Sequence, residues 1–217
     1  MQIATDIAHG LDYIHNNCSH RSDFSLIHNR IKSSSIIITE PDLQTKICHF
    51  GTSYLTEDGT DQDSFSRSES TFEGTRGYMS PEFKHSGVGT QESDVYSYGV
   101  VLLELLSGEE PLKYVFERES GVFRRVSIIE NAREVLGGGG DDGGGEEGRL
   151  RRWMDRRLRD SYPVEVAKEM TRVALECVEE DPEKRPGMGR VAGVEQSTWQ
   201  LKRVDKKRKR NATYLES

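Results

Sequence analysis

The side chains best suited to chemistry in this 217-residue sequence are its three cysteines and six histidines. Cys18, Cys48 and Cys177 are odd in number and far apart, which argues against a disulfide framework. No pair of cysteines or histidines has the spacing of zinc ligands. We therefore expect buried thiols in a reducing compartment and no metal site.

Two short segments contain further polar side chains that could take part in catalysis. Residues 28–35 read HNRIKSSS, and residues 49–51 read HFG. They belong to six blocks in the order IATDIAHGLDYIH, HNRIKSSSIII, KICHFG, GTRGYMSPE, SDVYSYGVVLLELLSGEEP and DPEKRP. Together the blocks resemble the C-terminal lobe of eukaryotic protein kinases, and most closely that of plant receptor-like kinases. Six blocks in order are far more specific than any single motif.

The departures from the family pattern fall on the residues that carry its chemistry. The resemblance puts Arg30 at the catalytic aspartate, Ser35 at a metal-binding asparagine and His49 at the aspartate of the Asp-Phe-Gly motif. The spacing from His28 to Lys32 is unchanged, so these are substitutions within an aligned loop. The family's aspartate accepts the proton of the substrate hydroxyl, whereas arginine has no acceptor. Serine and histidine are poor replacements for the oxygen ligands that Mg²⁺ prefers. The resemblance therefore implies that no catalytic group is retained.

Other matching positions belong to the family's substrate site and its scaffold. By resemblance, Lys32 and Thr75 would lie near the substrate hydroxyl, and Ile37 would lie under the adenine. The resemblance also implies that a buried ion pair, an anchor for the catalytic loop and two members of a hydrophobic spine are intact. Glu82 and Arg185 would form the ion pair, Asp94 would anchor the catalytic loop, and His28 and Phe50 would belong to the spine.

The family also uses a Gly-rich loop and a strand lysine from an N-terminal lobe. Neither motif occurs in this sequence. The resemblance therefore implies a mainly α fold, a kinase-like C-lobe with a small β-hairpin and the N-lobe missing. ATP and Mg²⁺ are the family's ligands, but we expect neither as a bound cofactor here. Repair of the three substituted positions is not expected to restore phosphate transfer without that lobe.

Local patterns predict the elements of this lobe. Two strand-like runs, Ser35–Thr39 and Gln44–Cys48, predict a hairpin. The polar segment Thr52–Phe72 predicts a long loop. A helix that is apolar all round and therefore buried is expected to begin at an N-cap, Ser93, and to end at Gly108.

The domain organisation follows from composition. We expect one kinase-like unit over residues 1–197, interrupted by a flexible, glycine-rich insert at 137–148. Residues 198–217 are expected to form a basic, disordered tail. Lys202–Arg210 holds seven basic residues and one acidic residue, whereas the whole chain has a net charge of -7. Bulk positive charge is therefore no basis for specific nucleic-acid binding.

The tail leaves three interpretations open. It could contact an anionic membrane, act as a nuclear import signal, or be a solvated chain end. A cytoplasmic location is expected, either generally or at the inner face of the plasma membrane, with the nucleus as the alternative.

The sequence favours a catalytically inactive pseudokinase that acts as a binding or scaffold module in kinase signalling. The resemblance implies other kinases or receptor complexes as partners. One alternative is an active Ser/Thr kinase that receives an N-lobe from elsewhere. Another is a truncated kinase fragment without a function of its own.

Overall fold

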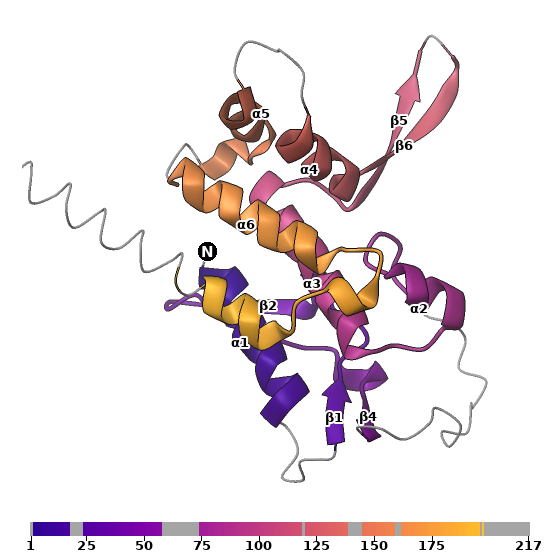
Figure 1. Ribbon diagram of the computed structural model, residues 1–217, viewed down its shortest axis with the longest axis vertical. Helices are drawn as coiled ribbons and strands as arrows, with labels where there is room; N and C mark the ends of the chain where they lie inside the picture. The colour runs from indigo at the N-terminus through magenta and orange to yellow at the C-terminus, as the bar shows by residue number, and fades with distance from the viewer. Residues whose placement is uncertain are drawn as a thin grey trace, which may run out of the picture.

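The computed structural model describes residues 2–17, 24–57, 74–118, 120–138, 145–158, 162–195 and 197. These residues are mostly helical and include three separate two-stranded antiparallel sheets. Figure 1 shows helices crossing the middle of the molecule, a small sheet at one end and a projecting hairpin at the other. This architecture agrees with the expectation of a mainly α fold with a small hairpin.

The bounds of the elements are as follows. The described α-helices are α1 (Gln2–Asn17), α2 (Pro81–Ser86), α3 (Gln91–Ser107), α4 (Ile128–Gly137), α5 (Gly145–Trp153) and α6 (Val164–Cys177). Residues 188–195 are also helical. The described strands are β1 (Phe24–Ile27), β2 (Ile36–Thr39), β3 (Gln44–Ile47), β4 (Tyr54–Glu57), β5 (Leu112–Glu117) and β6 (Val122–Ser127), paired β1–β4, β2–β3 and β5–β6. Four 3-10 turns are η1 (Ser33–Ser35), η2 (Phe50–Thr52), η3 (Arg156–Leu158) and η4 (Pro182–Lys184).

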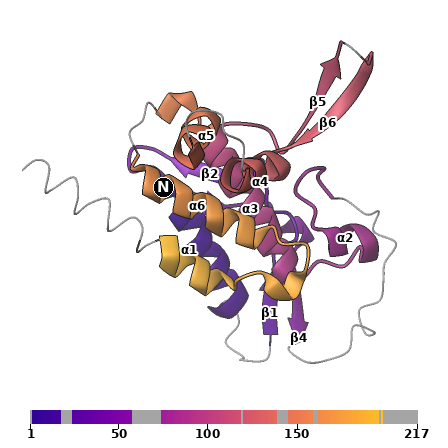
Figure 2. The ribbon, with the colours of Figure 1, turned by 45° about the horizontal axis from the view of Figure 1, so that its top comes forward.

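Helix α3 is the centre of the core, as its apolar sequence predicts. It packs against α6, α4 and α1, and Figures 1 and 2 both show α6 lying along it. The contact with α6 depends on Gly99, because a Cβ built there would lie 2.7 Å from Cys177 Cβ and 2.9 Å from the Ala174 carbonyl oxygen. A larger residue at this position would push the two central helices apart.

The start of α3 differs from the expected one. Thr90 is the N-cap, and its side chain accepts a hydrogen bond from Ser93 N. Ser93 Oγ in turn accepts from Thr90 N, which completes a capping box with Ser93 at its third helical position. The expectation that Ser93 is the N-cap was therefore wrong. Gly108 ends the helix in a left-handed conformation, as expected.

Parts of two expected loops belong to helices or strands. The predicted loop Thr52–Phe72 begins with the end of η2 and with β4, which pairs with β1, while residues 58–73 lie outside the described residues. The insert 137–148 is also shorter than expected. Residues 145–148 form the first turn of α5, and Glu146 there contacts Lys168 of α6 at 2.7 Å. Residues 139–144 and the tail 198–217 lie outside the described residues.

Hairpin β5–β6 was not expected from the sequence. It leaves the body between α3 and α4 and projects beyond the helices in both ribbon views (Figures 1 and 2). Phe116 and Phe123 face each other across it, with ring centroids 5.2 Å apart. Both rings are more than half exposed, so the hairpin adds little to the core.

A buried carboxyl group links the last described helical segment to the centre of the fold. The Glu195 side chain is fully buried and contacts the hydroxyl of Tyr98, which also contacts the Ala4 carbonyl oxygen at 3.2 Å. A hydroxyl has one proton, so Tyr98 can donate to only one of these two oxygen atoms at a time. Burial raises the pKa of Glu195 to about 7, although hydrogen bonding from the Tyr98 hydroxyl acts in the opposite direction.

This pKa makes the stability of the fold depend on pH. The folded state holds the Glu195 proton more tightly than the unfolded state, whose glutamate pKa is about 4.3. The stabilisation is complete below that value and is lost as the pH rises through about 7, by roughly 4 kcal/mol in all. We expect Glu195→Gln to flatten this slope between pH 5 and about 8 in chemical denaturation, whereas Glu165→Gln on an exposed position should leave it unchanged. Parallel pH profiles for the parent chain and the Glu195 variant would contradict this interpretation.

Candidate functional site

The loop that follows β1 is held by the carboxylate of Asp94 in the first turn of α3. Asp94 Oδ2 accepts from His28 N at 2.7 Å, and Asp94 Oδ1 accepts from Asn29 N at 2.8 Å. His15 Nε2 of α1 lies 3.2 Å from the same carboxylate. Both the carboxylate and His15 are buried, so the loop, α1 and α3 meet at one charged group without contact with solvent.

His28 links the anchored loop to the segment that begins at Cys48. Its Nδ1 accepts from Arg30 N at 3.2 Å, and its Nε2 lies 3.0 Å from the Cys48 carbonyl oxygen, to which it donates as the neutral tautomer. Burial lowers the pKa of His28, although the nearby Asp94 carboxylate raises it. The ring of Phe50 meets the His28 ring edge-on, with centroids 4.7 Å apart. The two residues that the resemblance assigns to a spine are therefore in contact.

The three substituted positions lie together in space. Ser35 Oγ donates to the Arg30 carbonyl oxygen at 2.8 Å. His49 Nδ1 lies 3.5 Å from the same Ser35 hydroxyl. The Ser35 side chain is buried, whereas His49 is exposed and has a left-handed backbone, with φ at 70°. The main chain of Arg30, the hydroxyl of Ser35 and the imidazole of His49 therefore lie close together.

The residues expected near substrate and nucleotide occupy different places. Arg30 and Thr75 both line a small pocket of about 30 Å³ between the loop and the start of α3. Lys32 is half-buried just before η1 and is not among the residues that line this pocket. Ile37 lies on β2 opposite Lys46, and its side chain is 49% exposed.

A polar chain beside this pocket was missed by the sequence analysis. Ser33 Oγ and the Tyr78 hydroxyl are 2.9 Å apart, and the Tyr78 hydroxyl donates to Glu104 Oε2 at 2.8 Å. Burial raises the pKa of Glu104 and raises that of Tyr78 to about 12. The signal in the sequence is Glu104 itself, because a carboxylate within the apolar run of α3 requires a partner.

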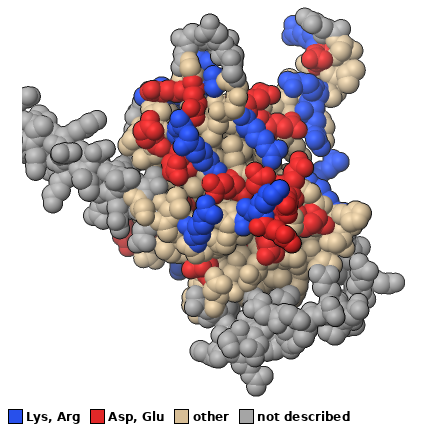
Figure 3. Space-filling model, viewed as in Figure 1, with Lys and Arg blue, Asp and Glu red and all other residues tan. Residues whose placement is uncertain are grey.

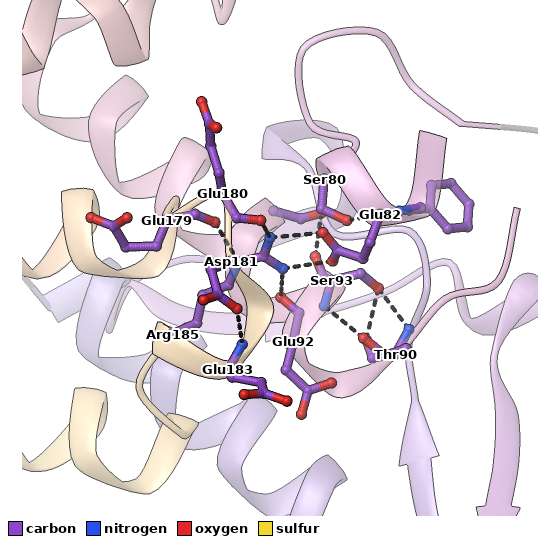
Figure 4. A network of polar contacts seen from close by, with 12 residues as sticks. Ser80, Glu82, Thr90, Glu92, Ser93, Glu179, Glu180, Asp181, Glu183 and Arg185 are labelled. Atoms are coloured by element: carbon purple, nitrogen blue, oxygen red, sulfur yellow. Dashed lines mark hydrogen bonds and ion pairs between the residues drawn. The ribbon is translucent and has the colours of Figure 1, made fainter. Parts of the chain in front are cut away.

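The second anchor joins α2 to the segment after α6, and Figure 4 shows its geometry. Arg185 Nη1 and Nη2 donate to the two carboxylate oxygens of Glu82 at 2.6 and 2.8 Å. The remaining three donors of the guanidinium bind the carbonyl oxygens of Glu92, Glu180 and Glu179, so that all five N–H groups are used. Arg185 also lies over the Tyr96 ring, 5.1 Å from its centroid.

The charge of Glu82 is stabilised by this arrangement. Burial acts to raise the pKa of Glu82, but hydrogen bonds from Arg185 and Ser80 and the positive guanidinium outweigh it, and the net pKa is lowered. The Arg185 side chain is 0% exposed and that of Glu82 is 25% exposed. The pair therefore fixes the N-terminal turn of α2, which follows the pocket-lining residues 74–80, against the C-terminal part of the chain.

The comparisons with known proteins identify the family of the chain. The family model for the protein kinase domain matches residues 1–199. The chain belongs to this family. Among curated protein kinase relatives, wall-associated receptor kinase 5 of Arabidopsis thaliana is 34% identical over 192 residues, which are 88% of this chain and 23% of that protein.

Two further relatives come from the same plant. Protein LYK5 is 32% identical over 191 residues, which cover 88% of this chain and 27% of that protein. PTI1-like tyrosine-protein kinase 1 is 33% identical over 191 residues, which cover 88% of this chain and 46% of that protein. The chain thus spans less than half the length of these relatives. No helix among the described residues is long and apolar enough to cross a membrane.

The Arg185 anchor yields a prediction on stability. Arg185→Ala leaves a partly buried carboxylate and three backbone carbonyl oxygens without their donor, at a cost of about 3 kcal/mol or more. We expect the melting temperature to fall by roughly 6–12 °C. The matched control is Arg190→Ala, because Arg190 pairs with Glu176 at 3.2 Å with both side chains about half exposed or more. Its melting temperature should change by about 2 °C or less. Equal shifts for both variants would refute a special role of Arg185.

Proposed function

We propose that this protein kinase family member is a pseudokinase, a module that binds partners in kinase signalling but transfers no phosphate. The observation that supports the proposal is an arginine, Arg30, at the position that the resemblance assigns to the family's catalytic aspartate. A guanidinium donates hydrogen bonds only, so it has no lone pair for the proton of a substrate hydroxyl. Loss of a general base typically lowers a rate by about 10²–10⁴.

The donor set around Ser35 does not suit Mg²⁺ either. The Ser35 hydroxyl already donates to the Arg30 carbonyl oxygen, and the nearby group is the imidazole of His49. Mg²⁺ prefers carboxylate and other hard oxygen ligands in an octahedron. Among the residues that the structure describes, no three histidine, cysteine or acidic side chains are grouped as a metal site.

The contacts of the scaffold favour a binding role over the alternative of a truncated kinase fragment without a function of its own. The Asp94 anchor and the Glu82–Arg185 pair keep the loop and α2 in defined positions without a contribution from catalytic groups. A surface with fixed geometry can serve recognition even when its chemistry is lost. We further propose receptor-kinase assemblies as partners, because several relatives are named as receptor kinases. A cytoplasmic location, with membrane or nuclear contact through Lys202–Arg210, remains a proposal, since that segment lies outside the described residues.

The test is phosphate transfer from radiolabelled ATP to a generic Ser/Thr peptide in the presence of Mg²⁺. We expect the purified chain to incorporate no label above a reaction without protein. A parallel preparation of Lys32→Ala identifies a contaminating kinase, because contaminating activity would be equal in both preparations. Turnover by the parent chain that the Lys32 variant loses would overturn the pseudokinase proposal and favour an active Ser/Thr kinase.

A further inference from the structure

The projecting hairpin β5–β6 presents an unusual surface for a water-soluble element. Five large apolar side chains on it are between 48% and 65% exposed, and they occupy both faces of the two-stranded sheet. They are Tyr114, Val115, Phe116, Val122 and Phe123. Among the described elements, only β6 makes an extended contact with β5. Such an open, apolar strand edge normally pairs with another chain or is protected by charge.

The two edges of the hairpin differ in whether each can pair with a second copy of the same strand. On β6, Arg124 and Arg125 are adjacent, so an antiparallel copy of β6 centred there would place two arginines opposite each other. On β5, the order is Lys113, Tyr114, Val115, Phe116, Glu117, with opposite charges at the two ends. An antiparallel copy of β5 centred on Val115 would place each lysine opposite a glutamate. The β5 edge is therefore complementary to itself, whereas the β6 edge repels itself.

The hydrogen-bond alternation of the hairpin supports the same register. Ile128 N donates to the Pro111 carbonyl oxygen at the base, so residues 111 and 128 form a hydrogen-bonded pair. Because such pairs alternate, the backbone groups of Lys113, Val115 and Glu117 point toward β6, and those of Tyr114 and Phe116 point outward. With Val115 on a twofold axis, Tyr114 of one copy faces Phe116 of the other. Both residues then have free backbone N–H and C=O groups for each other.

We propose that β5 is a homodimerisation strand, which pairs antiparallel with β5 of a second copy about a twofold axis at Val115. The product is a four-stranded sheet in the order β6–β5–β5–β6. One of its faces carries a row that runs Phe123, Phe116, then Tyr114 and Arg125 of the second copy. Aromatic neighbours of this kind stabilise antiparallel sheets. On the opposite face, Val115 meets Val115, flanked by the two lysine–glutamate pairs.

The existing contacts of the charged residues allow this pairing. Lys113 contacts Glu109 at 3.1 Å with both side chains 38% exposed, and Glu117 accepts from Ser120 at 2.8 Å. An ammonium has three donors and a carboxylate has about four acceptor positions, so each can take a further partner. The proposed interface contains six residues from each copy, which is far fewer than the roughly 20–30 residues on each side of a standard interface. The dimer is therefore weak, and it forms at micromolar concentrations or above.

Charge reversal tests both the interface and its register. In sedimentation velocity on the full chain over about 1–300 µM, we expect a concentration-dependent dimer of the parent. Lys113→Glu alone, or Glu117→Lys alone, places like charges opposite each other and should raise the dissociation constant roughly tenfold or more. The double variant Lys113→Glu with Glu117→Lys should return to within about threefold of the parent. An equimolar mixture of the two single variants should likewise form heterodimers.

A cross-linking pair tests the position of the axis. Val115→Cys places two thiols at a non-hydrogen-bonded antiparallel pair, where the Cα atoms are about 4.5 Å apart and a disulfide can form. The control is Val122→Cys, because Val122 is more exposed than Val115 (61% against 48%) but lies on β6, away from the axis. On mild oxidation we expect a covalent dimer of the Val115 variant, at least fivefold above that of the Val122 variant and of the parent. Equal cross-linking of the two variants, a parent that stays monomeric at every concentration, or a double variant as weak as the single ones would each overturn the proposal.

Discussion

The arrangement of the site depends on the buried carboxylate of Asp94. It accepts hydrogen bonds from two successive backbone N–H groups of the loop after β1, and it also contacts His15 of α1. A buried carboxylate without donors would be strongly destabilising, so the loop has one low-energy position relative to α3. Because α3 is itself enclosed by α1, α4 and α6, this position is transmitted to the rest of the core. None of these bonds to Asp94 comes from the side chain of residue 30.

Because the anchors act on backbone groups, a kinase fold could lose its chemistry and keep its shape, as we propose for this chain. The anchors act on main-chain groups of residues 28 and 29, and His28 extends them to the carbonyl oxygen of Cys48. The substituted side chains at Arg30, Ser35 and His49 contribute none of these bonds to Asp94. The Asp94 anchor is therefore independent of these three side chains, although the Ser35 hydroxyl holds the loop separately through the Arg30 carbonyl oxygen. The surface in Figure 3 shows acidic and basic side chains interspersed on the face that is in view.

The sequence predicted the elements whose pattern is set by burial. Helix α3 is apolar all round because it is enclosed, and the hairpin β2–β3 is marked by two strand-like runs around a turn. Only the resemblance could predict the contacts between the three substituted positions, because residues 30 and 49 are far apart in the sequence and come together only in the fold. The start of α3 was misplaced because Thr90 and Ser93 are both good caps three residues apart, and only their mutual hydrogen bonds decide the order.

Elements that form through long-range contacts have no clear pattern in the local sequence. Strand β4 lies in a polar segment and exists through its pairing with β1. Hairpin β5–β6 has apolar residues on both faces and neither face is buried, so the alternation typical of a half-buried strand is absent. The partner of Glu195 is Tyr98, almost a hundred residues earlier, and no local pattern could connect them.

We propose that the fold of a kinase site is retained without the groups that use Mg²⁺. The affinity of the chain for ATP tests this directly, when it is measured by isothermal titration calorimetry in Mg²⁺ and again in EDTA. We expect any ATP affinity to be the same in both conditions, within about threefold, because none of the three substituted positions carries a carboxylate that can hold the metal. An affinity that rises about tenfold or more when Mg²⁺ is added would contradict it.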